Sequence, residues 1–182
     1  MSTKFVLSLV LFGFMGTALA DPPFTLFVDQ GACPGEGCTY GNWRVTKTAL
    51  LRAKPDTDAQ VVGRVTPGTH VNALTGEVHV IPRQFVVSKP NPHGRYKRGD
   101  VLWVYTYAGE GNFKVWFDGT IFNEDLGFSP YGGSSGTRCQ ESPECWGELK
   151  GEYQQTWWVR IKTDKGLTGW SDAKNFTHES MH

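Results

Sequence analysis

The side chains with the potential for acid–base or metal chemistry are scattered along this chain. Its histidines occur neither in an HExxH motif nor in another metal-ligand spacing. No G-x-S-x-G sequence offers a serine nucleophile. The sequence therefore predicts no metal site, no cofactor and no catalytic residue. The histidines in question are His70, His79, His93, His178 and His182.

Four acidic residues lie close enough in the sequence to be weighed as a carboxylate pair for sugar hydrolysis. Acidic side chains scattered over hairpins are usually just solvated, and nothing in their spacing singles out two of them. A cell-wall hydrolase is therefore the weakest function considered for this chain. The four residues are Glu110, Asp118, Glu124 and Asp125.

The first twenty residues have the pattern of a secretory signal peptide. Lys4 precedes an apolar stretch over residues 5–15, and Ala18-Leu19-Ala20 supplies the small residues of a cleavage site ahead of Asp21. The apolar stretch is short for a membrane span, which needs about 20 residues. We expect cleavage after Ala20 and a soluble, exported chain, either periplasmic or secreted.

Four cysteines in an oxidising compartment predict disulfide bonds. Cys33, Cys38, Cys139 and Cys145 allow three connectivities, and all three stay open from the sequence alone. Their spacing favours two local loops, Cys33–Cys38 and Cys139–Cys145, because turn residues fill both intervals. The rival is a zinc site of four thiolates, but neither pair has the C-x-x-C spacing of zinc ribbons.

Composition restricts the classes of partner. The 182 residues carry 18 Lys+Arg and 18 Asp+Glu, so the formal net charge is zero, and the basic footprint of a nucleic-acid-binding domain is missing. The hydrophobic fraction is 39% and the charged fraction 20%, which is typical of a globular chain. With 22 Gly and 10 Pro, the chain is rich in turn residues. Together these values favour a turn-rich β protein without a nucleic-acid partner.

Short apolar and β-branched runs, bounded by turn residues, predict an all-β fold. Each run has the length and alternation of a strand. Residues 108–112 and 163–166 have the composition of hairpin connections. The predicted strands are 49–52, 61–65, 69–74, 101–107, 114–117 and 157–161.

Aromatic residues are the candidate ligand-binding side chains of the second half of the chain. Trp103, Tyr105 and Tyr107 alternate along one predicted strand and are expected to project from one face. Trp116 falls on the strand expected to pair with it. Two interpretations stay open for these rings, an aromatic ligand-binding surface or the core of a small barrel.

Two adjacent tryptophans near the C-terminus are candidates of the same kind. Trp157 and Trp158 point to opposite faces of a strand, so only one of them can serve the same core. The outward ring, together with Trp170 and a tyrosine, is expected to form an aromatic groove for a peptide or glycan. Trp158 is the member of the pair taken as the candidate.

The segments that begin and end this β region resemble the bacterial SH3-like domain family. Residues 48–55 (TALLRAKP) and 61–71 (VVGRVTPGTHV) are similar to the opening strands of that family, with its Pro-Gly turn. Residues 158–161 (WVRI), 169–171 (GWS) and Asn175-Phe176 are similar to its ending. The resemblance implies a small β-barrel, no catalytic residue belonging to the fold, and binding of peptidoglycan peptides or other proteins. It covers about 50 residues.

The two matching halves are far apart, which departs from the family pattern. We expect an N-terminal segment at 21–42, an SH3-like domain at 43–178 interrupted by a strand-rich insertion at about 77–156, and a tail at 179–182. The alternative is two small β units with interleaved strands. The first arrangement is preferred because the opening and closing motifs need each other to make one core.

The sequence patterns and the resemblance lead to three possible functions. The leading one is a non-catalytic exported module that binds a peptide, a peptidoglycan fragment or an envelope protein. The second is a structural or assembly subunit that uses the insertion at 77–150 as its protein interface, and the third is the hydrolase. The oligomeric state and the source are not determined by the sequence.

Overall fold

The computed structural model describes residues 25–34, 37–91, 93–130 and 144–178. These ranges form thirteen β-strands and one short 3-10 helix, η2 (Ala173–Asn175), so the all-β prediction is confirmed. The predicted signal segment at 1–20, the tail at 179–182 and Cys139 lie outside the described residues. Within the described ranges, no helix is long and apolar enough to span a bilayer.

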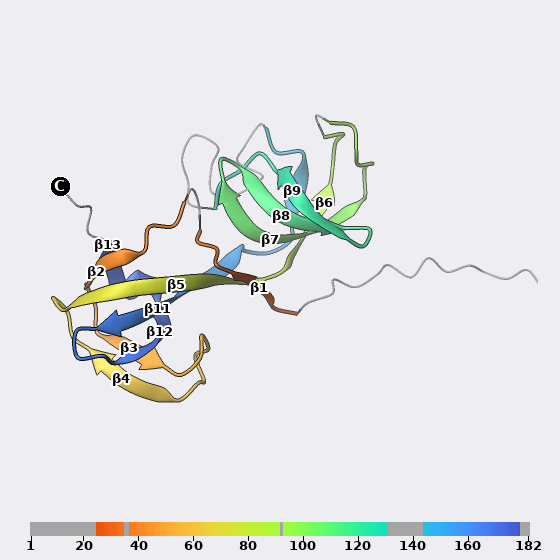
Figure 1. The fold of residues 1–182 in the computed structure, drawn as a ribbon. Helices are drawn as coiled ribbons and strands as arrows, with labels where there is room; N and C mark the ends of the chain where they lie inside the picture. The colour runs from red at the N-terminus through yellow and green to blue at the C-terminus, as the bar shows by residue number, and fades with distance from the viewer. Residues whose placement is uncertain (1–24, 35–36, 92, 131–143, 179–182) are drawn as a thin grey trace, which may run out of the picture.

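The first sheet combines strands from both ends of the chain. It curls around one side of the molecule, and its strands follow the order β13-β2-β5-β11-β12-β3-β4, with β1 also paired to β5 (Figure 1). The strands are β1 (Phe27–Gln30), β2 (Gly41–Val45), β3 (Ala49–Arg52), β4 (Val61–Val65), β5 (His70–Ile81), β11 (Gln154–Thr163), β12 (Thr168–Asp172) and β13 (Phe176–His178).

The second sheet is built mainly from the middle of the chain. Its five strands follow the order β10-β6-β7-β8-β9, and all neighbouring strands are antiparallel. They are β6 (Arg83–Val87), β7 (Val101–Gly109), β8 (Asn112–Phe117), β9 (Thr120–Asp125) and β10 (Gly147–Leu149).

Two long strands carry the chain from the first sheet to the second and back. β5 and β11 pair antiparallel from Val71↔Thr163 to Ile81↔Gln154, with one irregularity beside Arg160. The chain leaves the first sheet after β5, builds the second sheet, and returns through β11 (Figure 1). The first sheet therefore brings together the two segments that resemble an SH3-like domain, although the resemblance itself stays a prediction.

Each sheet covers a hydrophobic core of its own. The first core is formed by Trp43, Val45, Ala49, Leu51, Val65, Val71, Ala73, Val159, Ile161 and Ala173. The second is formed by Phe85, Val87, Tyr96, Leu102, Val104, Tyr107, Phe113, Val115, Leu126, Phe128, Cys145 and Trp146. Both predicted domain arrangements are compatible with two cores, so the choice between them stays a prediction.

One expectation about β7 is wrong. Tyr107 packs in the second core together with Leu102 and Val104, so it does not share a face with Trp103 and Tyr105. The register between β7 and β8 shifts between Val104 and Tyr107. An extra residue of this kind in a strand reverses the direction of every side chain after it, which alternation in the sequence does not reveal.

Candidate functional site

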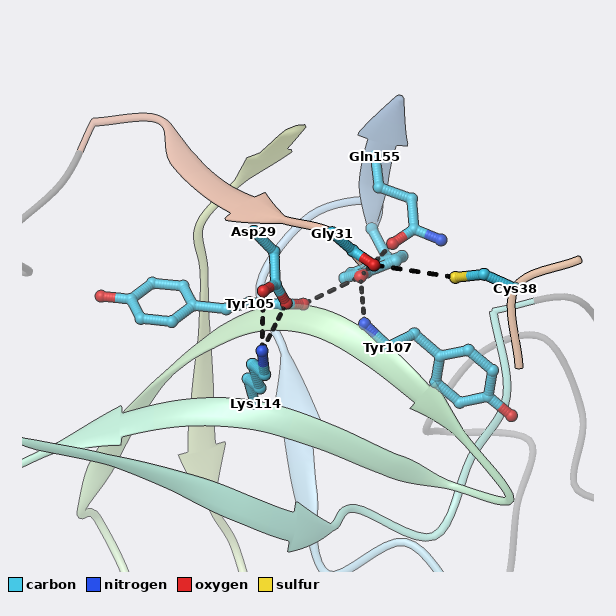
Figure 2. Close-up of polar contacts among 8 residues, drawn as sticks. Asp29, Gly31, Cys38, Tyr105, Tyr107, Lys114 and Gln155 are labelled. Atoms are coloured by element: carbon cyan, nitrogen blue, oxygen red, sulfur yellow. Dashed lines mark hydrogen bonds and ion pairs between the residues drawn. The ribbon is translucent and has the colours of Figure 1, made fainter. Parts of the chain in front are cut away.

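The Cys33–Cys38 disulfide predicted from the spacing is present. Its Cα atoms are 5.6 Å apart, and Sγ of Cys38 lies 3.9 Å from the carbonyl oxygen of Gly31, just beyond the end of β1 (Figure 2). Cys145 is disulfide-bonded as well, whereas its expected partner, Cys139, lies outside the described residues. The disulfide therefore closes the loop that leads from β1 into β2.

An ion pair ties β1 of the first sheet to β8 of the second. Nζ of Lys114 lies 2.7 Å from both carboxylate oxygens of Asp29 (Figure 2). The Asp29 side chain is 10% exposed and that of Lys114 is 37% exposed. A carboxylate that is almost buried needs such a partner, because an unpaired charge removed from water is costly. The pair therefore fixes where β1 lies against the second sheet.

The hydroxyl of Tyr153 makes a second polar connection between the sheets. It accepts the backbone N–H of Tyr107 at 2.8 Å, and it lies 2.8 Å from the carbonyl oxygen of Tyr105 and 2.7 Å from Oε1 of Gln155 (Figure 2). A phenol carries one proton and two lone pairs, so it donates to one of these two oxygens at a time. This contact anchors the start of β11 to the bulged part of β7.

Tyr105 occupies the apolar part of the same junction. Its ring is fully buried and stacks on Phe27 of β1, with 4.2 Å between centroids and 6° between planes. Its hydroxyl finds no hydrogen-bond partner among the described residues, and burial raises the pKa of Tyr105 to about 12. The structure thus places this predicted ligand-binding residue inside the junction between the sheets.

The junction supports one face of a three-stranded ribbon made of β1, β5 and β11. Directly opposed residues in antiparallel strands point to the same side of a sheet. Val28 opposes His79, which opposes Thr156, while Glu77 opposes Trp158 one row further along. At the other end of this part of the ribbon, Ile81 of β5 opposes Gln154 of β11. These residues, which belong to three distant parts of the chain, share one face.

A groove runs along this face and under the loop between β3 and β4. Its volume is about 560 Å³. Leu26 and Ile81, which line it, are 44% and 43% exposed, and neighbouring Val28 is 39% exposed. The lining consists of Leu26, Pro55, Asp56, Thr57, His79, Ile81, Tyr153, Gln154, Gln155, Thr156 and Trp158. We call this site the ribbon groove.

An acid–imidazole pair and an aromatic ring form one end of the ribbon groove. Nε2 of His79 lies 2.6 Å from Oε1 of Glu77, and the two side chains are 14% and 12% exposed. The ring of Trp158 lies 6.2 Å from that of His79, between centroids, and is 5% exposed. Trp158 is therefore part of the wall of the ribbon groove and leaves only an edge accessible.

The two neighbouring tryptophans of β11 point to opposite faces, as predicted. Trp157 packs against the first core, with its ring 5.4 Å from that of Trp43, whereas Trp158 lines the ribbon groove. Trp170 opposes Arg160, two residues from Trp158 on the same face, but it does not line the groove. The tyrosine that does line it is Tyr153.

Trp103 and Trp116 lie on the second sheet, away from the ribbon groove. They oppose each other across β7 and β8, and Ile121 of β9 continues the row. Trp103 is half-buried, Trp116 is 9% exposed and Ile121 is 42% exposed. Their neighbours Leu102 and Val115 face the second core, so this row is on the outer face of the sheet.

The structure does not bring all four acidic residues considered for hydrolysis together, although Asp125 lies beside Gly111, the neighbour of Glu110. Glu110 and Asp118 occupy the turns at the two ends of β8. Glu124 is buried, and its Oε2 accepts a hydrogen bond from the hydroxyl of Tyr96 at 2.8 Å. Burial and the hydrogen bond to Glu124 raise the pKa of Tyr96 well above its ordinary value. In the described part of the chain, no three His, Cys, Asp or Glu side chains could hold a metal ion together.

Most residues of the ribbon groove were not predicted from the sequence. Residues 26–30 (LFVDQ) begin with a short apolar run of the kind found in strands, but they were not predicted as one. His79 and Ile81 lie beyond the predicted end of the strand at residue 74, although β5 continues to Ile81. Alternation of Val78 and Val80 with Glu77 and His79 was the signal that extends this strand.

Comparison of this chain with models of protein families, with curated proteins and with solved structures gives no match.

Proposed function

We propose that this protein is a non-catalytic, exported binding module that holds an extended peptide in the ribbon groove. One observation carries the proposal: Leu26, Val28 and Ile81 are large apolar side chains left substantially exposed on one face of a firmly held ribbon. Exposed apolar side chains gathered along a groove are typical of a binding surface. The peptide belongs to a partner protein of the cell envelope or to peptidoglycan.

The ribbon groove is organised before any ligand arrives. The pair Asp29–Lys114 and the hydroxyl of Tyr153 fix β1 and β11 against the second sheet. Little free energy is then needed to order the protein when a ligand binds, and preorganisation of this kind raises affinity. Amide and hydroxyl groups of Gln154 and Thr156 line the groove beside the apolar side chains, where they offer hydrogen bonds to a peptide backbone.

Export and the SH3-like assignment belong to the same proposal. The signal pattern at 1–20 and the Cys33–Cys38 disulfide support an oxidising compartment. The gathering of the two SH3-resembling segments in the first sheet supports a common ancestry with that family. On this proposal the second sheet is an insertion that holds the ribbon from behind, through the pair Asp29–Lys114 and the hydroxyl of Tyr153.

Sedimentation with peptidoglycan sacculi tests the proposed function. Mature protein is pelleted with intact sacculi and with sacculi stripped of their stem peptides by an amidase. We expect Trp158→Ala to abolish pelleting and Trp170→Ala to preserve it, because only Trp158 lines the ribbon groove. Circular dichroism checks that each variant is folded. Equal loss in both variants would contradict binding at the ribbon groove.

The row formed by Trp103, Trp116 and Ile121 favours a second candidate function. A half-buried tryptophan beside an exposed isoleucine on the outer face of the second sheet fits a structural subunit that associates through residues 77–150. Light scattering after size exclusion separates the candidates. A subunit of this kind forms oligomers that Ile121→Lys dissociates, whereas a binding module alone keeps the same mass in both forms.

A further inference from the structure

The charges around the ribbon groove are predominantly acidic. No Lys or Arg lines it, whereas Asp56 does. Oδ1 of Asp56 accepts the backbone N–H of Asp58 at 2.8 Å, and this bond holds the carboxylate at the tip of the β3–β4 loop. Asp56 is exposed, so its charge faces a ligand without a large desolvation cost. The loop wall of the groove thus presents a fixed negative charge.

Beside the opposite wall lies one more carboxylate that no Lys or Arg among the described residues neutralises, that of Glu77. Trp158 lies between two carboxylates, because Glu77 opposes it on β5 and Asp172 opposes it on β12. Glu77 is paired with His79 at 2.6 Å, and Asp172 with Lys174 at 2.6 Å. Lys174 neutralises Asp172, so only the Glu77 carboxylate adds to the negative charge of Asp56.

The basic residues near this face, Lys54 and Lys174 included, do not line the ribbon groove. Arg160 follows Trp158 on the same side of β11, but it opposes Trp170, outside the lining. Arg52 donates to the carbonyl oxygen of Ala59 at 2.8 Å. Neither guanidinium belongs to the groove lining, so the acidic character of the lining is preserved.

We propose that the ribbon groove selects an extended protein segment in which a basic residue and an apolar residue are separated by one position. This proposal rests on the proposed function above. His79 and Ile81 are two residues apart on one strand, and side chains at this spacing lie about 7 Å apart on the same face. An extended ligand has the same repeat. Its apolar side chain packs on Ile81 and Leu26, and its basic side chain lies between Asp56 and the pair Glu77–His79.

Three peptide pools test this selectivity. Each pool contains acetylated and amidated heptapeptides with a central Leu-x-Lys, Leu-x-Gln or Leu-x-Glu, in which x and the flanking positions are mixed small polar residues. Fluorescence anisotropy measures the affinity of the mature, oxidised protein for each pool. We expect Leu-x-Lys to bind about fivefold more tightly than Leu-x-Gln, since exposed ion pairs contribute at most about such a factor. Leu-x-Glu should bind most weakly, and added salt should reduce the differences.

A matched pair of variants locates the effect. Asp56→Asn keeps an oxygen that accepts the N–H of Asp58, so the loop is retained while the charge is lost. Asp164→Asn removes one charge from the exposed β11–β12 turn and serves as the control. We expect the preference for Lys over Gln to vanish in Asp56→Asn and to persist in Asp164→Asn.

Three results would overturn the proposal. They are equal binding of the Lys and Gln pools, a preference that survives in Asp56→Asn, and failure of all pools to bind. In the first two cases the ribbon groove still binds peptides, so the proposed function stands while the selectivity falls. In the third case, pelleting with intact sacculi that Trp158→Ala abolishes would assign the groove to peptidoglycan, and the absence of pelleting as well would remove the proposed function.

Discussion

Tyr105 and Tyr153 provide the sharpest test of the junction that supports the ribbon groove, because the same substitution should have opposite effects at the two positions. Tyr105→Phe keeps the ring that stacks on Phe27 and removes a buried hydroxyl that has no hydrogen-bond partner among the described residues. Leaving such a group unsatisfied costs about 1–3 kcal/mol. We therefore expect Tyr105→Phe to raise the free energy of unfolding by about 1 kcal/mol at pH 7.

Tyr153→Phe is the matched control. It removes a hydroxyl that accepts the N–H of Tyr107 and contacts the backbone of Tyr105 and the side chain of Gln155. The loss should lower the free energy of unfolding by about 1–3 kcal/mol, because a part-buried N–H loses its acceptor. Urea denaturation of both variants and the unaltered protein measures these changes. A destabilised Tyr105→Phe would refute the claim that its hydroxyl is unpartnered.

Tyr105 also makes the stability of the protein depend on pH in the alkaline range. Burial raises the pKa of Tyr105 from its ordinary value of about 10 to about 12. Between these values the unfolded chain releases the phenol proton while the folded protein keeps it, so stability falls as the pH rises. This stability is fully present below pH 10, and its loss amounts to about 2–3 kcal/mol by pH 12. Tyr105→Phe should lose less stability over this range, and parallel curves for the two proteins would contradict the assignment.

Three further predictions concern stability and can be measured by urea or thermal denaturation. Lys114→Met should cost about 1–3 kcal/mol because it leaves Asp29 almost buried without its partner, and the double variant with Asp29→Asn should recover part of the loss; additive effects would show that the two do not interact. Gly76→Ala should destabilise by about 1–3 kcal/mol, since its Cβ would lie 2.6 Å from Nε1 of Trp157, and an unchanged midpoint would disprove this close packing. Reduction of Cys33–Cys38 should cost only about 2 kcal/mol, because the loop it closes spans 5 positions; global unfolding on reduction would contradict this.

Local features of the fold were predictable from the sequence. Strands β3 and β4 begin and end at the predicted residues, and the connection between β7 and β8 falls in the predicted turn. In each case a short β-branched or apolar run is bounded by Gly, Pro or polar residues, and this information is contained within a few positions. The Cys33–Cys38 disulfide was predictable for the same reason, because the short loop that it closes consists of turn residues.

The ribbon groove was not predictable because it depends on register between distant strands. Val28, His79 and Thr156 form one row only because β1 and β11 both pair with the second half of β5. A shift of one residue in either pairing would turn these side chains to the opposite face. The register between β7 and β8 was not predictable either, and the bulge in β7 turns Tyr107 to the opposite face. Trp158 was identified because a pair of adjacent tryptophans must diverge on any strand, whatever its register.

The most direct test of the central claim compares two isoleucine-sized side chains on β5. Ile81 and Leu74 are 43% and 42% exposed, but only Ile81 lines the ribbon groove. Burying the exposed part of Ile81 under a ligand contributes about 1 kcal/mol, so Ile81→Ser should weaken binding of the Leu-x-Lys pool about fivefold. Leu74→Ser should leave the affinity unchanged. Equal affinities of the two variants, or a larger loss in Leu74→Ser, would contradict a peptide site in the ribbon groove.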